Sequence, residues 1–289
     1  MHSRDGSPRI WRLKSRELLL DHPIVMGILN VTPDSFSDGG NFFAPDTALA
    51  HAARMVEEGA EIIDVGGEST RPGAIPVEAA QESDRVVPVI EEVRRRFPDL
   101  VISIDTTKAD VATAALAAGA NILNDVSAMR LDPDMPVVAA SNSAGVVLMH
   151  SRGDVTNMAS YQNAVYENVV REVLDELGSQ LLLAEEAGVD RKNIALDPGI
   201  GFSKRTEHSR ELIEKLDQFA TYDCPIIVGL SRKRMLTDVI NRGRLTLEER
   251  DAATAAFNVL ALRRGAIVFR VHNVKKSRHA LDEAWSELT

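Results

Sequence analysis

Polar side chains that can take part in chemistry follow short apolar runs along the whole chain. The first such run ends in Asn30, the second contains Asp64, and the third ends in Asp105. The later ones, in chain order, are Asn124, Asp125, His150, Asp197, Ser231, Lys233, Arg270 and His272. A carboxylate accepts paired hydrogen bonds from a ring N–H and an amino group, an amide donates and accepts at once, and basic groups bind anions. The set therefore suits a ligand with a nitrogen-rich ring and an anionic group.

Each of these residues, taken alone, has a second interpretation. An Asp, Asn or Ser after a strand can accept hydrogen bonds from the N–H groups that open the next helix. For Asp105 in SIDTTKAD and Ser231 in GLSRKR this capping role is at least as good as ligand binding. We interpret Asp125, next to Asn124, as structural. One shared pocket nevertheless explains the whole series better than many separate caps.

Short apolar runs alternate with longer segments patterned for helices from Ile24 to the C-terminus. The predicted strands are Val25–Leu29, Ile62–Val65, Val101–Ile104, Ile122–Leu123, Val146–Met149, Ile194–Leu196, Ile226–Val228 and Ile267–Val271. The predicted helices are Thr47–Glu58, Ala79–Arg96, Ala109–Ala118, Ala164–Ala187 and Glu248–Arg263, with a last helix after Val274. Four helix ends carry a Gly suited to a left-handed C-cap, at Gly59, Gly119, Gly188 and Gly265.

This alternation predicts parallel strands with crossover helices, and eight such units favour a closed (β/α)8 TIM barrel. We expect a single domain over residues 24–289, with residues 1–23 as an N-terminal extension that packs on the barrel. The alternative is an open dinucleotide-binding sheet, which lacks its main signal because no GxGxxG follows the first strand. In a barrel the polar residues at the strand ends would share the rim where active sites lie.

The composition of the 289-residue chain excludes several classes of partner. Its formal net charge of -10 argues against general binding to nucleic acid or to an anionic membrane. The N-terminus shows neither a signal peptide nor a membrane span. A single cysteine, Cys224, fits a reducing compartment and a buried structural role. We therefore expect a soluble, cytoplasmic protein.

Two loops and one strand end stand out at the expected rim. The loops VTPDSFSDGGNFF and GGESTRPGA are rich in turn formers, and we interpret them as lids rather than as simple surface loops. Arg270 and His272 have the same parity on their strand, so both can face one side. They would make a diphosphate clamp, or alternatively a charge pair that neutralises Asp residues inside the barrel.

The motifs at these positions resemble those of dihydropteroate synthases, a family of pterin-binding barrels. The matching segments, in order, are MGILNVTPDSFSDGG (Met26 to Gly40), DVGGESTRPGA (Asp64 to Ala74), ISIDTTKADVA (Ile102 to Ala112), ILNDVSA (Ile122 to Ala128), VVLMH (Val146 to His150), LDPGIGFSK (Leu196 to Lys204), GLSRKR (Gly229 to Arg234) and RVHNV (Arg270 to Val274). The resemblance covers nearly the whole barrel, and its first two motifs are specific to that family.

The resemblance implies a transferase of folate biosynthesis that joins 4-aminobenzoate to 6-hydroxymethyl-7,8-dihydropterin diphosphate, releasing diphosphate. It implies a pterin site made of Asp105, Asn124, Met149, Asp197, Phe202 and Lys233. It implies a Mg²⁺ ligand at Asn30 and a diphosphate clamp at Arg270 and His272. Thr70, Arg71 and Pro72 would help to shape the diphosphate and aminobenzoate sites, with Phe202, Ser231 and Lys233 nearby. The groups expected to act in catalysis are Asp105, Lys233, Arg270 and His272.

The resemblance also implies a homodimer formed through outer helices, for which Ala252–Leu262 could supply a face. Two departures from the family pattern are Asn273, where Asp is usual, and GIGFSK after the sixth strand. They leave the response to sulfonamide analogues of aminobenzoate open. Two other functions stay open: a methyltransferase-type pterin barrel, which would not need the diphosphate residues, and a pterin-binding protein without catalysis.

Overall fold

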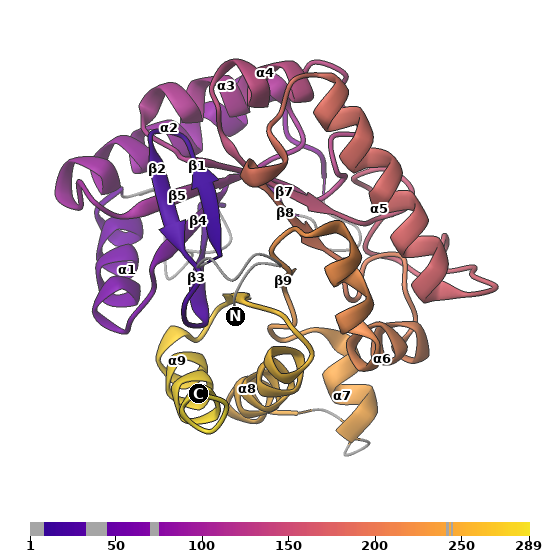
Figure 1. The fold of residues 1–289 in the computed structure, drawn as a ribbon. Helices are drawn as coiled ribbons and strands as arrows, with labels where there is room; N and C mark the ends of the chain where they lie inside the picture. Colours follow the sequence, from indigo (N-terminus) through magenta and orange to yellow (C-terminus); the bar gives the residue numbers. More distant parts are fainter. Residues whose placement is uncertain (1–8, 33–44, 70–74, 241–242, 244) are drawn as a thin grey trace.

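The strands form one parallel, nearly closed barrel in the computed structural model, which describes residues 9–32, 45–69, 75–240, 243 and 245–289 (Figure 1). They are β3 (Ile24–Asn30), β4 (Ile62–Gly66), β5 (Val101–Asp105), β6 (Ile122–Asp125), β7 (Gly145–Met149), β8 (Ile194–Asp197), β9 (Ile227–Val228) and β10 (Val268–Val271). Their order is β8-β7-β6-β5-β4-β3-β10-β9, and a parallel bridge between Leu196 and Ile226 joins the two ends. The predicted TIM barrel is confirmed.

Helices surround this barrel on its outer side (Figure 1). They are α1 (Pro45–Glu57), α2 (Ala79–Arg96), α3 (Ala109–Ala118), α4 (Met135–Ser141), α5 (Val169–Glu186), α6 (Thr206–Glu214), α7 (Arg234–Ile240), α8 (Leu247–Arg263) and α9 (Val274–Ser286), with 3-10 turns η2 (Arg191–Asn193) and η3 (Leu216–Tyr222). The four predicted cap glycines all have positive φ, from 98° at Gly59 to 118° at Gly119. None of the helices in the described ranges combines the length and apolar character needed to cross a bilayer.

One helix boundary differs clearly from the prediction. Helix α5 begins at Val169 rather than at Ala164. The side chain of Asn168 accepts a hydrogen bond from the N–H of Arg171 at 3.0 Å, and this cap fixes the start. The short helices α4, α6 and α7 were not predicted.

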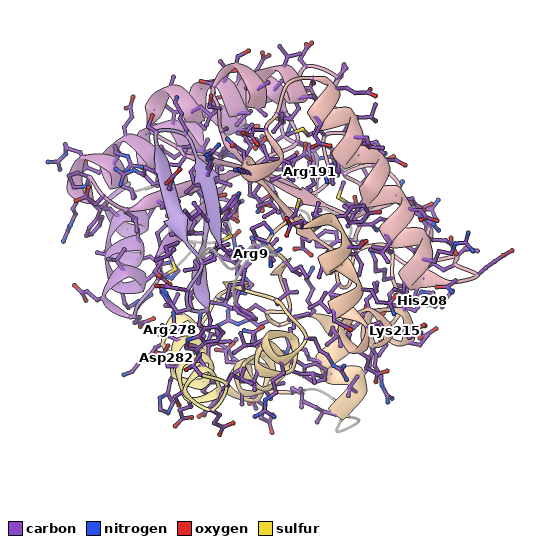
Figure 2. All side chains as sticks on the ribbon, in the orientation of Figure 1. Arg9, Arg191, His208, Lys215, Arg278 and Asp282 are labelled. Carbon is purple, nitrogen blue, oxygen red and sulfur yellow. The ribbon has the colours of Figure 1, made fainter. Side chains whose placement is uncertain are left out.

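A β-hairpin precedes the barrel and packs against its N-terminal end. Strands β1 (Ile10–Leu13) and β2 (Arg16–Leu19) are antiparallel and lie across the barrel opening in Figure 1. Trp11 is fully buried, and its indole N–H donates to the carbonyl of Asn193 at 2.7 Å. Arg9, labelled in Figure 2, donates to the carbonyl of Cys224 at 2.9 Å. Cys224 itself is buried, as predicted.

The interior of the barrel changes from apolar to polar along the strands. At the N-terminal end, the first inward positions form one apolar cluster that the hairpin covers: Ile24, Met26, Ile62, Val101, Ile122, Val147, Ala195, Ile227 and Val268, with Trp11, Leu13 and Leu20. A separate, larger cluster lies between the strands and the helices. Because side chains alternate along a strand, the next inward positions continue to Asp64, Asp105, Asn124, Asp197 and Arg270. The polar groups are thus gathered at the C-terminal end of the barrel.

Candidate active site

A hydrogen-bonded cluster of charged groups occupies the C-terminal end of the barrel interior. Arg270 Nε donates to Asp64 Oδ2 at 2.6 Å, and Arg270 Nη2 donates to Asp105 Oδ2 at 2.5 Å. Asn124 Nδ2 lies 3.2 and 3.3 Å from the two oxygens of Asp64. Three predicted residues, Arg270, Asp105 and Asn124, are therefore brought together. Arg270 also makes the charge pairs with Asp residues that the sequence left as an alternative.

Asp64 is among the polar strand residues noted in the sequence but not among the site residues that the family resemblance implies. It is fully buried and contacts both Arg270 and Asn124, so it fixes the two side chains relative to each other. Its signal in the sequence was its place on the second strand, with inward parity and the GGES motif directly after it. Its role depends on a contact between residues 206 positions apart, which no local spacing reveals.

Burial shifts the protonation of these groups. Burial raises the pKa of Asp105 to about 7, and the nearby Arg270 charge opposes this rise. Burial also raises the pKa of Asp197, against the hydrogen bond from Gly199 N–H and the charge of Lys233. The pKa of Lys233 is lowered to about 7 by burial, against the attraction of Asp197. Burial acts to lower the pKa of Arg270, but Asp64 and Asp105 outweigh it, and this pKa is raised. Arg270 is therefore the permanent cation of the cluster.

Lys233 and Phe202 form one wall of the cluster. Lys233 Nζ lies 3.7 Å from the centre of the Phe202 ring, a cation–π contact. Phe202 also belongs to a small apolar group with Met149, Val126 and Met158. Gly201 has φ +79°, and a Cβ there would lie 3.0 Å from Lys233 Cδ. Glycine at 201 thus lets this lysine approach the loop closely.

Ser231 and His272 form a second pair at the same end of the barrel. Ser231 Oγ and His272 Nδ1 lie 2.9 Å apart, and the backbone N–H of His272 donates to Ser231 Oγ at 3.1 Å. The following residue, Asn273, caps α9 by accepting from Lys276 N–H at 3.0 Å. Asn273 also donates to Asp251 at 2.9 Å. Its side chain therefore turns to α8 and α9, as strand parity predicts.

Asn30 ends β3 beside Asp105. A Cβ on Gly66 would lie 3.9 Å from Asn30 Oδ1 and 3.8 Å from Asp105 Oδ2, so both oxygens border the same small space. The predicted substrate residues Thr70, Arg71 and Pro72, and most of the predicted first lid, at 33–44, lie outside the described residues.

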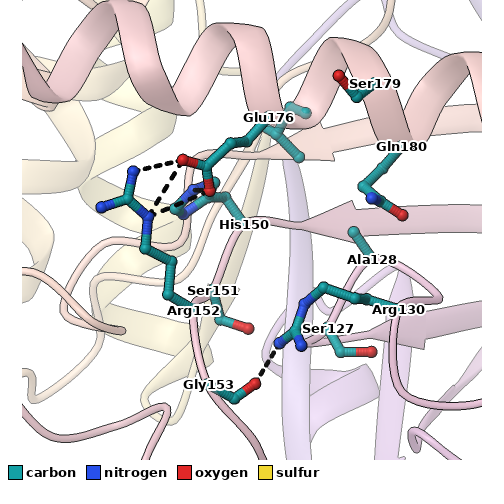
Figure 3. Close-up of a pocket in the computed structure, with 11 residues that line it drawn as sticks. Ser127, Ala128, Arg130, His150, Ser151, Arg152, Gly153, Glu176, Ser179 and Gln180 are labelled. Carbon is teal, nitrogen blue, oxygen red and sulfur yellow. Dashed lines mark hydrogen bonds and ion pairs between the residues drawn. The ribbon is translucent and has the colours of Figure 1, made fainter. Parts of the chain in front are cut away.

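Two further polar residues at strand ends have structural partners. Asp125 accepts from the N–H groups of Ser127 and Met129 at 2.7 and 3.1 Å, which confirms its structural interpretation. His150 directly follows β7 and borders a cavity of about 340 Å³ between the loops after β6 and β7 and helix α5 (Figure 3). None of the predicted substrate residues that the structure describes lines this cavity, so it is separate from the cluster in the barrel.

Fold and cluster together define a class: a (β/α)8 barrel enzyme with a charged site at the C-terminal ends of its strands. The family model described as pterin binding enzyme matches residues 26–272. The chain belongs to this family, among its dihydropteroate synthases, which are transferases of a pterinylmethyl group in folate biosynthesis.

Curated relatives and solved structures agree with this assignment. A dihydropteroate synthase of Streptococcus pyogenes is 46% identical over 88% of this chain and 91% of its own length. That of Bacillus subtilis is 44% identical over 95% of this chain and 92% of its own. Two structures of the Xanthomonas albilineans synthase, one with 4-aminobenzoic acid and one with 7,8-dihydropteroate, are similar with TM-scores of 0.89 and 0.85. They are 41% and 39% identical, covering 98% and 96% of this chain and 98% of theirs.

Proposed function

We propose that the charged cluster binds the pterin ring of 6-hydroxymethyl-7,8-dihydropterin diphosphate and that the chain transfers its methylene carbon to 4-aminobenzoate. The observation that carries this proposal is the meeting of two carboxylates, an amide and the Arg270 guanidinium inside one barrel mouth, with Lys233 and Phe202 at its wall. The solved relatives that hold 4-aminobenzoic acid and 7,8-dihydropteroate support these ligands.

The pterin ring would lie between the inward side chains of β6, β8 and the loop after β9. A pterin presents a ring N–H and an amino group, which can donate to one carboxylate, and a ring oxygen and nitrogens that accept. Asp197 Oδ1 already accepts from Gly199 N–H at 2.7 Å, which fixes this carboxylate to receive the ring edge. Asn124 and Lys233 would donate to the acceptors, and Met149 and Phe202 would cover the ring faces.

The diphosphate would lie toward β10. Arg270 lies in β10, and His272, directly after this strand, has the same side-chain parity. Ser231 Oγ lies 2.9 Å from His272 Nδ1 and orients the imidazole. The guanidinium has a third nitrogen, Nη1, that can bind a phosphate oxygen while Nε and Nη2 keep Asp64 and Asp105. Thr70, Arg71 and Pro72 complete this proposed site from the second loop.

The donor set also fits a magnesium ion that arrives with the diphosphate. Asn30 offers an amide oxygen at the barrel mouth beside Asp105. Within the described ranges no three His, Cys, Asp or Glu side chains gather as a metal site, and Mg²⁺ is typically held by few protein oxygens together with phosphates and water. Asn30 would hold the ion, which when bound supplies neutralising charge to the diphosphate.

The residues favour departure of the diphosphate before attack by the amine. The C–O electron pair leaves with the diphosphate, whose charge Arg270 and His272 stabilise. The pterin methylene becomes cationic, and the Asp105 carboxylate would stabilise this charge through space. The nitrogen of 4-aminobenzoate then forms the C–N bond and loses a proton. No covalent enzyme intermediate is required.

We further propose that the protein is a cytoplasmic homodimer. The lone cysteine is buried, and burial raises its pKa to about 12, which fits a protein without disulfide chemistry. On α8, the exposed Ala252, Ala256 and Leu260 recur every four residues and form one outer stripe. Analytical ultracentrifugation tests the dimer, and Leu260→Glu should then give monomers.

Two measurements test the proposed function. Purified protein with Mg²⁺ and the dihydropterin diphosphate should release diphosphate only when 4-aminobenzoate is added. Arg270→Ala should weaken binding of the diphosphate substrate far more than binding of bare pterin, whereas Asp197→Ala should weaken both. The absence of any aminobenzoate-dependent release would refute the proposed function, and equal losses in Arg270→Ala would refute the clamp.

A further inference from the structure

Lys204 is one of the largest fully buried side chains in the described part of the chain. It lies after β8, seven residues beyond Asp197, and is only 1% exposed. Its Nζ contacts three groups: His150 Nδ1 at 2.7 Å, the Phe202 carbonyl at 3.0 Å and the His150 carbonyl at 3.3 Å. The proposed chemistry uses neither Lys204 nor His150.

The hydrogen bonds around His150 indicate which nitrogen of its ring carries the proton. His150 Nε2 is 3.0 Å from Glu176 Oε2, and Arg152 Nε lies 3.1 Å from the other oxygen of Glu176 (Figure 3). Burial acts to raise the pKa of Glu176, but the bonds from His150 and Arg152 lower it to about 2, so Glu176 is a carboxylate. A carboxylate only accepts, so Nε2 carries the proton and Nδ1 is an acceptor.

All three partners of Lys204 are therefore acceptors, and only an ammonium group has three N–H bonds to give them. Burial lowers the pKa of Lys204 well below its usual value, and the Asp197 carboxylate opposes this. Burial and the Lys204 charge lower the pKa of His150 to about 4, which keeps the imidazole neutral. A buried ammonium costs desolvation energy that an apolar side chain of the same length would avoid. The hydrogen bonds that this ammonium donates must therefore offset its desolvation cost.

Through two carbonyl groups, those of His150 and Phe202, Lys204 holds the backbone that follows Asp197. Gly199 has φ +68°, and a Cβ there would lie 1.8 Å from the His150 carbonyl, so the loop runs directly against the end of β7. Phe202 N–H donates to the Gly199 carbonyl at 3.0 Å, and its own carbonyl accepts from Lys204. The Phe202 ring then faces Lys233 at 3.7 Å. Lys204 thus fixes, from outside the site, the wall on which Phe202 and Lys233 meet.

We propose that Lys204, oriented by His150 and Glu176, is a positioning residue that sets Phe202 and Lys233 for the second substrate. This rests on the proposed function and adds to it that Phe202 and Lys233, besides bordering the pterin, lie next to the site of 4-aminobenzoate. Asp197 belongs to β8, and its carbonyl accepts from His150 N–H at 2.9 Å within the strand pairing. Loss of Lys204 should therefore move the loop and leave the pterin-binding carboxylate in place.

The test compares Lys204→Met with a matched surface change, Lys215→Met. Lys215 follows α6 at the periphery of the molecule and pairs only with Glu211 in the described structure, at 2.7 Å (Figure 2). We expect Lys204→Met to raise KM for 4-aminobenzoate about tenfold or more, because ångström-sized misplacement has effects of this order. Binding of bare pterin, measured by calorimetry, should weaken clearly less than the aminobenzoate KM rises, because Asp197 and Asn124, which hold the ring edge, stay in place. Amide hydrogen exchange of residues 198–203 should speed up without substrates, and Lys215→Met should change none of these.

A second comparison separates positioning from general loss of stability. In a Phe202→Ala background, Lys204→Met should add little to the rise in KM, because the group through which it acts is gone. Additive effects, or equal losses for pterin and aminobenzoate, would overturn the proposal. Unchanged amide hydrogen exchange at residues 198–203 in Lys204→Met would also refute the positioning role. This measurement uses no substrate, so its outcome does not depend on the proposed function. If Lys204→Met does not fold, Glu176→Ala, whose side chain is 42% exposed, should raise the aminobenzoate KM in the same selective way, and an unchanged KM would refute the role.

Discussion

Replacing Arg270 with Met removes the cation that joins Asp64 to Asp105 in the barrel. Its Nε and Nη2 lie 2.6 and 2.5 Å from the two carboxylates. The Asp64 side chain is 0% exposed and that of Asp105 is 14% exposed. Met fills most of the volume of the arginine stem without its charge, so the variant leaves two buried carboxylates facing each other. We expect this to lower stability strongly at neutral and alkaline pH.

The size of the effect follows from these contacts. Removing one partner of a buried ion pair typically costs about 3–5 kcal/mol. For a chain of this size each kcal/mol lowers Tm by roughly 2–4 °C, which gives a deficit of about 6–20 °C at pH 8.

The deficit should shrink on acidification. Burial raises the pKa of Asp105 from 3.8 to about 7 while Arg270 opposes the rise, so in the variant this pKa is higher still. A carboxyl group whose folded pKa exceeds the unfolded value contributes stability that is present at low pH and lost as pH rises through the folded pKa. The variant should therefore approach the wild type toward pH 5 and fall behind it toward pH 8.

Thermal unfolding from pH 5 to pH 8.5 measures this difference. Arg263→Met is the control, because Arg263 is 53% exposed and pairs at the surface with Glu287. Its Tm should stay within about 1–2 °C of the wild type, since exposed pairs contribute little. A deficit for Arg270→Met that is absent at pH 8, or that does not change with pH, would refute the reasoning.

Three further predictions follow from other parts of the barrel. Burial lowers the pKa of Lys233 from 10.5 to about 7, so above pH 7 this side chain binds fewer protons in the folded than in the unfolded chain. In urea unfolding, the stability of the wild type should therefore rise from pH 7 to pH 10, by at most about 1.4 kcal/mol per pH unit. Lys233→Met should flatten this slope. Trp11→Ala should cost about 3–5 kcal/mol in the same assay and leave kcat at low temperature unchanged, because the hairpin closes the end of the barrel opposite the site. Ser231→Ala removes the hydroxyl that contacts His272 and should weaken binding of the diphosphate substrate several-fold in calorimetry, while bare pterin binds as before.

Much of this fold was predictable because its signals are local. Each inner strand is a short apolar run, and glycine ends the preceding helix at Gly59, Gly119, Gly188 and Gly265. The hairpin was missed because IWRL and RELL are short and rich in charge. Helices α4, α6 and α7 were missed because seven to nine residues carry too little periodicity.

The candidate site was predictable for the residues that parallel strands must bring to one rim. Asp105, Asn124, Asp197 and Arg270 follow directly from strand position and parity. What local spacing could not reveal were contacts across the barrel, such as Arg270 with Asp64, and the burial of Lys204, whose GFSK context is typical of an exposed loop.

A crystal structure with bound pterin tests the central claim most directly. The account predicts the ring inside the barrel mouth, with its N–H and amino edge on the Asp197 carboxylate and within hydrogen-bond distance of Asn124 and Lys233. A pterin bound instead in the cavity beside His150 and α5, with Asp197 making no contact to it, would contradict the account.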